Sequence, residues 1–164
     1  MSSVTIRPIT SGDNAAIAEI IRDNLRAFHL DIPGTAYFDP ELDCLSSYYN
    51  AFPDKRGYFI VTSDDGTVMG GVGIAEFTGF DNCAEIQKLY LADPAKGKGL
   101  GKKLMQTAED FARAYGYSAL YLETHTNLEA AIGLYERLGF QQIEKPAAVL
   151  HSTMNRFFRK ELNT

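Results

Sequence analysis

The sequence predicts an α/β fold of the α+β kind, with a mixed, mostly antiparallel central sheet of about seven strands flanked by about four helices. Three observations predict it. Two apolar segments joined by an Asp-Asp-Gly turn at residues 64–66 are typical of a β-hairpin. Segments with strand and helix periodicity then alternate in the second half of the chain. Because its 164 residues contain no internal repeat and no linker, residues 1–164 are expected to form a single domain.

The first part of the chain predicts one strand and two helices. Apolar and polar residues alternate around residues 4–10, which is typical of a strand. A helix is expected from Ser11 or Asp13, either of which can cap it, to about His29. After a Pro-Gly break, an Asp-Pro pair predicts a second helix over residues 39–50. The apolar stripe of the first helix consists of Ile17, Ile20, Ile21, Leu25 and Phe28.

The middle of the chain predicts three strands. Residues 55–63 and 68–77 form the hairpin, and residues 82–91 form the next strand. The second strand of the hairpin contains several glycines, which indicate a β-bulge, a close approach to the backbone, or ordinary strand packing. These glycines are Gly70, Gly71 and Gly73.

The last part of the chain predicts two helices and three strands. A helix over residues 100–115 has one apolar face and stops before a glycine. A strand at residues 118–123 and a helix at about 127–138 follow. Residues 140–143 and 151–162 supply two closing strands. Helices are therefore expected on both faces of the sheet.

Composition and charge exclude several classes of protein. Apolar residues make up 45% and charged residues 23%, as in ordinary globular proteins. We find neither a signal peptide nor an apolar run long enough to cross a bilayer, so a cytoplasmic protein without a membrane partner is expected. The net charge of −5 disfavours a general nucleic-acid-binding surface, which must neutralise several phosphates.

Potential metal ligands are few and widely spaced. Cys44 and Cys83 lack the close pairing of a zinc or redox motif and are expected to be small buried apolar residues. His29, His125 and His151 show no ligand spacing. We therefore expect no metal site.

A lysine- and glycine-rich loop between the strand at 82–91 and the helix at 100–115 suits a phosphate group. Its glycines let the backbone turn tightly, and the first free N–H groups of the helix point at the same place. A P-loop is excluded because Gly97 and Gly101 enclose three residues instead of four. A Rossmann fingerprint is excluded because Lys102 stands three positions after Gly99, where glycine is required.

The loop instead resembles the signature of the GNAT acetyltransferases, which is Arg or Gln, two residues, Gly, any residue, then Gly or Ala. Lys96, Gly99 and Gly101 match its spacing, although Lys96 replaces the usual Arg or Gln. A second block, residues 127–140, is similar to the family's Asn, Ala, Leu-Tyr, Leu-Gly-Phe pattern. The specific motifs lie between Glu85 and Phe140, and the N-terminal half resembles the family in element order alone.

The resemblance implies that the protein uses acetyl-CoA as co-substrate and needs no metal. Main-chain N–H groups of the loop would hold the pyrophosphate, and the pantetheine arm would run along the strand at residues 89–91, beside an edge left open by the splaying of the strand at 118–123. Asn127 would cap the following helix. It would either act as a cap alone or also reach the pantetheine amides, and both alternatives stay open. The cofactor-binding candidates are Leu89, Tyr90, Leu91, Lys96, Gly97, Lys98, Gly99, Leu100, Gly101, Lys102 and Asn127.

The resemblance also implies direct attack of an amine on the thioester within a ternary complex. A main-chain N–H near Leu89, at a bulge, would stabilise the oxyanion. Tyr135 corresponds to the tyrosine that protonates the departing thiolate, although its place on an apolar stripe equally fits packing. Glu85 is the first candidate for the general base and Glu76 the second, and a solvated strand glutamate is the alternative for both.

The acceptor is expected to be a small-molecule amine or a peptide amine. Acidic and aromatic residues of the first connecting segments suit a cation, and a solvated acidic loop is the alternative. These residues are Asp31, Asp39, Glu41, Asp43, Tyr37, Phe38, Tyr48 and Tyr49. The resemblance allows a homodimer. The alternative function is a non-catalytic acyl-CoA-binding regulatory protein of the same fold, which would need neither Tyr135 nor a base.

Overall fold

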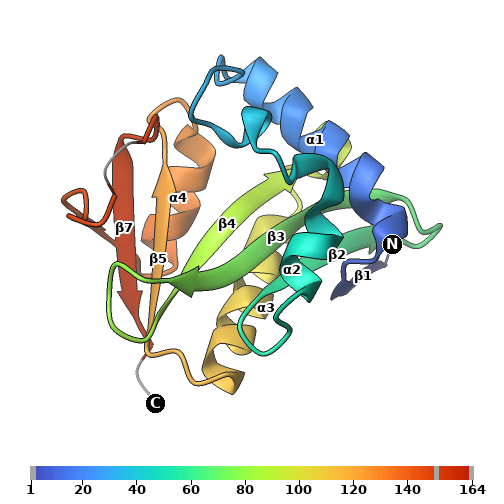
Figure 1. The fold of residues 1–164 in the computed structure, drawn as a ribbon. Coiled ribbons are helices and arrows are strands. Elements are labelled where there is room, and N and C mark those ends of the chain that lie inside the picture. The colour runs from blue at the N-terminus through green and yellow to red at the C-terminus, as the bar shows by residue number, and fades with distance from the viewer. Residues whose placement is uncertain (1–2, 150–151, 163–164) are drawn as a thin grey trace.

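The computed structural model describes residues 3–149 and 152–162, whose seven strands form one sheet in the order β1-β2-β3-β4-β5-β7-β6 (Figure 1). β4 and β5 are parallel, and the other neighbouring strands are antiparallel. The strands are β1 (Val4–Pro8), β2 (Gly57–Ser63), β3 (Val68–Phe77), β4 (Cys83–Leu91), β5 (Ala119–Thr124), β6 (Gln141–Ile143) and β7 (Arg156–Glu161). The predicted mixed, mostly antiparallel sheet is confirmed.

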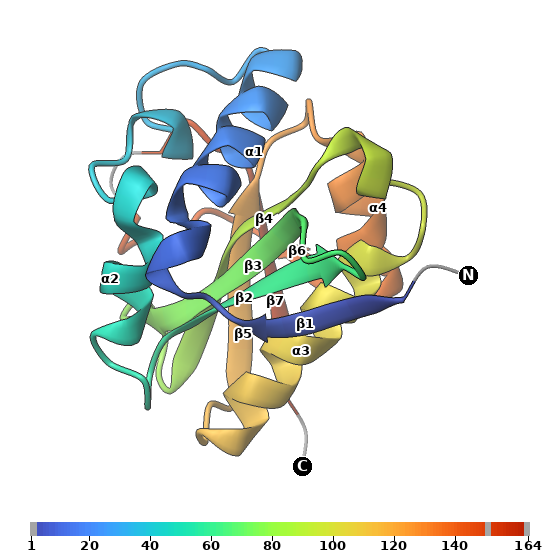
Figure 2. The same cartoon turned by 90° about the vertical axis from the view of Figure 1, so that its right-hand side faces the viewer.

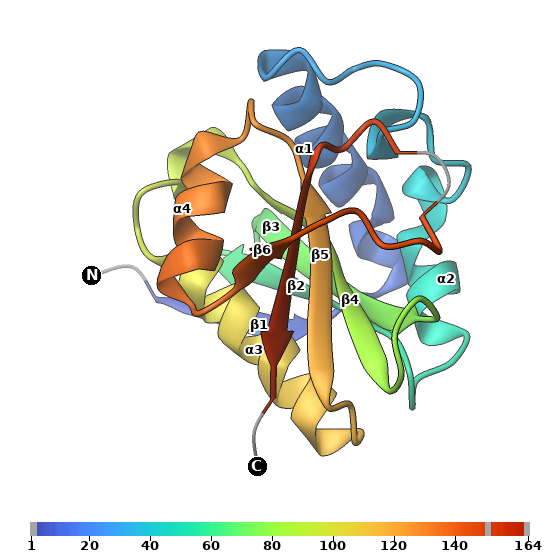
Figure 3. The same cartoon turned by 90° about the vertical axis from the view of Figure 1, so that its left-hand side faces the viewer.

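The helices cover both faces of this sheet, as predicted. They are α1 (Asn14–Ala27), α2 (Leu45–Asn50), α3 (Leu100–Ala114) and α4 (Glu129–Arg137). Figure 2 shows α1 and α2 on one face and α3 and α4 on the other, and Figure 3 shows the same arrangement from the side of β6 and β7. The apolar stripe of α1 packs with β2 residues in one core cluster, whereas the stripes of α3 and α4 pack in another.

β4 and β5 separate along their length. Among the described residues, the two strands pair only where Cys83–Glu85 lies against Ala119–Tyr121. Beyond Glu85 they diverge, so that the C-terminal half of β4 has an open edge (Figure 1). The splay implied by the family resemblance is therefore present.

A β-bulge interrupts β4 at the start of this open edge. The pairing of β3 with β4 shifts register between Gly71 and Gly73, so that Lys88 and Leu89 together face one residue of β3. Lys88 has φ 51°, in the left-handed region, and its carbonyl accepts a 2.8 Å hydrogen bond from the Tyr58 hydroxyl. The bulge near Leu89 is confirmed.

Two of the β3 glycines also allow a close approach of aromatic side chains. A Cβ on Gly71 would lie 2.4 Å from Cε1 of Tyr58, and a Cβ on Gly73 would lie 2.5 Å from the Tyr49 hydroxyl. Of the interpretations considered for these glycines, both the bulge and the close approach are correct.

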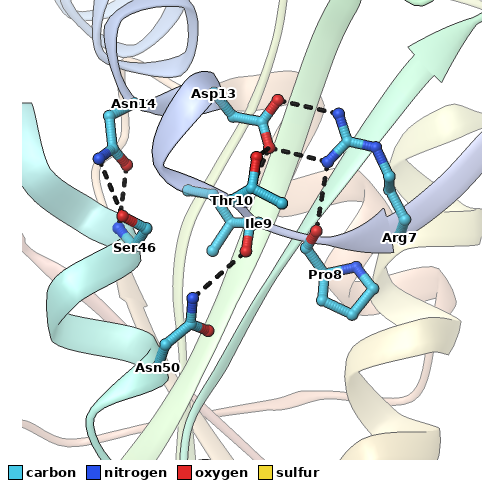
Figure 4. A network of polar contacts seen from close by, with 8 residues as sticks. All are labelled: Arg7, Pro8, Ile9, Thr10, Asp13, Asn14, Ser46 and Asn50. Atoms are coloured by element: carbon cyan, nitrogen blue, oxygen red, sulfur yellow. Dashed lines mark hydrogen bonds and ion pairs between the residues drawn. The ribbon is translucent and has the colours of Figure 1, made fainter.

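A polar network joins β1 to the two helices that cover the first face of the sheet (Figure 4). The Arg7 guanidinium donates two hydrogen bonds, of 2.7 and 2.8 Å, to the buried Asp13 carboxylate, which also accepts from Thr10 N–H. Asn14 donates to the Ser46 hydroxyl and accepts from its N–H. The start of α1 is therefore tied both to β1 and to α2.

Replacing Asp13 by Asn is expected to lower the free energy of unfolding at pH 7 by about 1–3 kcal/mol, because the Arg7 and Thr10 donors lose their charged acceptor. The hydrogen bonds from Arg7, more than any other cause, lower the folded-state pKa of Asp13 from 3.8 to about 2. The stabilisation is thus fully present above pH 4 and is lost as the pH falls toward 2. Urea unfolding at pH 7 and pH 2.5 should show the deficit shrinking at the lower pH. The same substitution at exposed Asp81 should have no effect, and a deficit independent of pH would contradict this account.

Several predicted boundaries were wrong. The helix expected over residues 39–50 begins as a 3-10 turn at Leu42–Cys44, and α2 proper starts only at Leu45. Asp39 is extended and does not cap a helix, because its carboxylate pairs with Lys88 at 2.8 Å. The last strand starts at Arg156, and His151, where it was expected to begin, lies outside the described residues.

Candidate active site

A cavity of about 520 Å³ lies where β4 and β5 separate. β4 and β5 contribute its walls, α4 and the start of α3 close one end, and the segment after α1 closes the other. Among the predicted site residues, the following line this cavity: Glu85, Leu89, Tyr90, Leu91, Lys96, Gly97, Gly101 and Tyr135. The structure therefore brings the two predicted catalytic residues and six of the predicted cofactor-binding residues to one place.

The N-terminus of α3 supplies unpaired donors at one end of the cavity. Within the described part of the chain, no backbone or side-chain acceptor meets the N–H groups of residues 98–102. Gly97 and Gly99 both have φ 77°, in the left-handed region. This backbone conformation lets the loop turn tightly into the start of the helix. Donors of this kind fit a diphosphate, because they are exposed and add to the positive end of the helix dipole.

The remaining loop residues divide by exposure. Lys98, Gly99 and Lys102 are exposed beside the helix start, whereas the Leu100 side chain is buried in the core. Leu100 therefore contributes to the loop only through its main chain. A Cβ on Gly101 would lie 3.2 Å from Leu134 on α4, so this glycine also allows the two helices to pack closely. Lys96 pairs with Asp93 at 2.9 Å.

Tyr135 lies on α4 and faces the cavity. Its side chain is 6% exposed, and its hydroxyl has no hydrogen-bond partner among the described residues. Burial, and secondarily the nearby Tyr90, raises the pKa of Tyr135 well above 10. The hydroxyl therefore stays protonated at neutral pH and is available as a donor to a group in the cavity. Packing against Phe140 and Phe158, the alternative interpretation, holds at the same time.

Glu85 lies on β4 and lines the cavity from the opposite side. Burial raises the pKa of Glu85 from 4.5 to about 7. A 3.0 Å hydrogen bond from Gln87 lowers the pKa by a smaller amount, and the charge of Glu123 raises it further. The Tyr49 hydroxyl in turn donates to Gln87 at 2.6 Å, which orients the amide. A carboxyl with a pKa near 7 is suited to take up a proton at neutral pH.

Glu76, the second candidate for the base, is not part of this site. Its carboxylate accepts a 2.6 Å hydrogen bond from the Arg56 guanidinium and does not line the cavity. Sequence alternation placed both glutamates on strands, but it did not show which of them faces the separating strand β5.

The role predicted for Asn127 as a helix cap is wrong. Leu128 occupies the N-cap position of α4, and no side chain caps that helix. The Asn127 amide instead donates a 2.9 Å hydrogen bond to the carbonyl of Phe28, just after α1. This contact joins the two faces of the molecule across the cavity, and Asn127 does not line the cavity itself.

The acceptor residues predicted from the sequence are divided between the cavity and the surface. Asp39, Glu41 and Tyr48 line the cavity, and the Tyr49 hydroxyl acts through Gln87. The others do not line it: Asp31, Tyr37, Phe38 and Asp43. Asp43 pairs instead with Arg22 at 2.8 Å. We therefore expect the acceptor to enter over residues 39–48.

Sequence reasoning assigned no role to many of the cavity residues, among them the polar Gln87 and Glu123. The alternation of β4 places Gln87 on the same face as Glu85, which was a usable signal. No sequence signal reveals the left-handed backbone at Lys88 or the pairing of β5 with β4, which brings Glu123 near Glu85.

Neither a membrane-spanning helix nor a metal-binding cluster is found among the residues that the structure describes. None of their helices combines the length and the apolar character needed to span a bilayer. Nor do they contain a group of three or more His, Cys, Asp or Glu side chains that could hold a metal ion.

Residues 17–140 match the sequence model of the Acetyltransferase (GNAT) family. An Escherichia coli K12 protein named uncharacterized N-acetyltransferase YjgM is 40% identical over 144 residues, which are 87% of this chain and 84% of the relative. The L-methionine sulfoximine/L-methionine sulfone acetyltransferase of Pseudomonas aeruginosa is 35% identical over 92 residues, 53% of each chain.

Solved structures share the fold at low sequence identity. A GNAT-family acetyltransferase of Staphylococcus aureus Mu50 has a TM-score of 0.86 and 17% identity, over 98% of this chain and all of that one. A putative acetyltransferase of Salmonella typhimurium, solved with acetyl-CoA, has a TM-score of 0.75 and 24% identity, over 99% of this chain and 95% of that one. Both similarities concern the fold.

Proposed function

The chain belongs to the GNAT family of acetyltransferases, and we propose that this acyltransferase moves an acetyl group from acetyl-CoA to a small primary amine by direct attack while both substrates are bound. One observation carries the proposal. Where β4 and β5 separate, a cavity reaches from Gly101, at the start of α3 with its unpaired amides, to Glu85 and Tyr135. A site with a phosphate-binding end and an acid-base end fits a reaction between a CoA thioester and an amine.

The residues of the chain divide the work between binding and proton transfer. Amides of residues 98–102 hold the pyrophosphate, and the open edge of β4 offers hydrogen bonds to the pantetheine arm. A main-chain N–H at the bulge near Leu89 receives the developing oxyanion. Glu85 takes the proton that the amine must lose before its lone pair attacks the carbonyl carbon. As the new N–C bond forms and the C–S bond breaks, Tyr135 donates its proton to the sulfur, and the second proton that the acetylated nitrogen then loses restores the Tyr135 hydroxyl.

A small acceptor is favoured over a protein chain for two reasons. The relative from Pseudomonas aeruginosa is named for two amino-acid derivatives, both of them small amines. The cavity is also limited to about 520 Å³, and it is lined by Gly34 and Met154 of the two loops that a 2.8 Å hydrogen bond from Thr153 to the Pro33 carbonyl joins. A Cβ on neighbouring Gly34 would lie 2.1 Å from the Thr153 hydroxyl, so the two loops are in contact.

The proposed function is tested by free-thiol release from acetyl-CoA over a panel of primary amines, with the acetylated amine identified by mass spectrometry. Turnover that depends on the amine and saturates with both substrates is expected. Tight CoA binding by calorimetry without turnover of any amine would instead indicate the alternative, a non-catalytic acyl-CoA-binding protein. Absence of CoA binding would contradict the assignment of the α3 loop.

Replacing Gly99 by Ala is expected to raise the Kd for CoA about 5- to 10-fold. Gly99 has φ 77°, so a side chain there costs roughly 1 kcal/mol and shifts the amides at the start of α3. Gly66→Ala is the matched control, because Gly66 has φ 85° and equally open surroundings in the distant β2–β3 turn. The two variants should lose similar stability, but only Gly99→Ala should bind CoA more weakly. Equal affinities in calorimetry would refute the loop assignment.

A further inference from the structure

The acceptor end of the cavity carries three carboxylates that form no ion pair among the residues that the structure describes. These carboxylates belong to Glu41, Glu85 and Glu123. The lining cations, Lys88 and Lys96, are already paired with Asp39 and Asp93, at 2.8 and 2.9 Å. A bound cation can therefore compensate these charges, whereas a substrate carboxylate would find no unpaired partner.

Glu123 is held in place by neutral donors. The Tyr121 hydroxyl donates to one carboxylate oxygen at 2.7 Å, and the Ser152 hydroxyl donates to the other at 3.1 Å. Tyr121 is itself fully buried and stacks on Phe77, with ring centroids 4.1 Å apart. Hydrogen bonds from neutral groups orient the charge without cancelling it, so the Glu123 carboxylate is prepared for an ionic partner.

Glu85 and Glu123 occupy neighbouring but separate positions. Glu85 pairs with Tyr121 across the parallel β4–β5 contact, and Glu123 lies two residues further along β5 on the same face. Diagonal neighbours of this kind are about 7–8 Å apart in a regular sheet, and the strands separate beyond this point. Two nitrogens joined by a short chain can therefore each be close to one of the two carboxylates.

We propose that Glu123 binds a second cationic group of the acceptor, and that the enzyme acts on small diamines whose other nitrogen is acetylated next to Glu85. This inference rests on the proposed function and names its substrate class. The buried Tyr135, whose hydroxyl faces the same cavity without a partner among the described residues, independently marks the cavity as a place for a ligand. The cavity volume of about 520 Å³ limits the size of that ligand.

The test compares kcat/KM for 1,4-diaminobutane, butylamine and L-alanine at one pH, by thiol release from acetyl-CoA. The diamine should exceed butylamine by ~10-fold or more, beyond the statistical advantage of two equivalent amines, because a charge-assisted contact is added. L-alanine should be the poorest, since its carboxylate faces acidic side chains. Equal values for diamine and monoamine, or a preference for L-alanine, would overturn the inference and leave the proposed function standing. No thiol release with any amine would overturn both.

Variants then assign the preference to one carboxylate. Glu123→Gln should bring the ratio of diamine to butylamine close to one, mainly through KM for the diamine, and should leave CoA affinity unchanged. Glu123→Asp, which keeps the charge, should retain part of the ratio. Glu136→Gln removes an exposed carboxylate of α4 outside the cavity and should retain all of it. A Glu123→Gln enzyme that loses activity equally toward both amines would contradict substrate binding by Glu123. If Glu123→Gln does not bind CoA, the ratios of diamine to butylamine kcat/KM in the wild type and in Glu123→Asp decide whether Glu123 binds the second cationic group.

Discussion

Tyr135→Phe is expected to lower kcat by about 10²- to 10⁴-fold, the range that general acid catalysis contributes, while the Kd for CoA changes little. The phenyl ring keeps its packing against Phe140 and Phe158, so the change removes only the hydroxyl. That hydroxyl has a raised pKa and faces the cavity, so it is the donor placed to protonate a departing thiolate. Steady-state kinetics of thiol release and calorimetry with CoA measure the two quantities separately.

Tyr115→Phe is the matched control for this experiment. Tyr115 follows α3, is 52% exposed and does not line the cavity, so its hydroxyl should be dispensable. Unchanged kcat in Tyr135→Phe would reduce Tyr135 to a packing residue and would require another proton donor. A large loss of CoA affinity would mean that the hydroxyl binds the co-substrate instead of acting in the chemical step.

Glu85→Gln is expected to lower kcat/KM by about 10²- to 10⁴-fold, again the range for a positioned proton-transfer group. Gln keeps the size of the side chain but cannot accept the proton of the amine. Glu76→Gln provides the comparison, because Glu76 is the other strand glutamate first considered for this role and pairs with Arg56 instead. A greater loss of turnover in Glu76→Gln than in Glu85→Gln would exchange the two assignments.

The pH dependence gives a second, independent readout of Glu85. A base with a pKa of about 7 is active when deprotonated, so kcat/KM of the wild type should rise with pH through that value, and the variant should lack this step. Stability should change in the opposite sense. The folded protein holds the Glu85 proton up to about pH 7, whereas the unfolded chain releases it near 4.5, so the free energy of unfolding falls as pH rises between these values. Glu85→Gln should remove that fall, as urea unfolding between pH 4.5 and 8 would show.

Local patterns predicted most of the fold, because they depend on neighbours within a few residues. The apolar runs of β2 and β3, the apolar stripe of α3 and the glycine-rich start of that helix all lie where the local sequence pattern indicated. The helix expected at residues 39–50 starts late because Asp39 forms its ion pair with Lys88, far along the chain, instead of capping a helix. The cap assigned to Asn127 failed for a similar reason, since its amide binds the Phe28 carbonyl.

The sequence by itself determined the order of the elements, the position of the α3 loop and the identity of Tyr135 and Glu85 as candidates, because turn residues, periodicity and motif spacing are local properties. Only the tertiary structure decided that β4 and β5 separate beyond Glu85, that Glu76 is outside the cavity, and that Glu123 is inside it. Which face of a strand borders a cavity depends on pairing between segments distant in the chain, and no local pattern encodes that pairing.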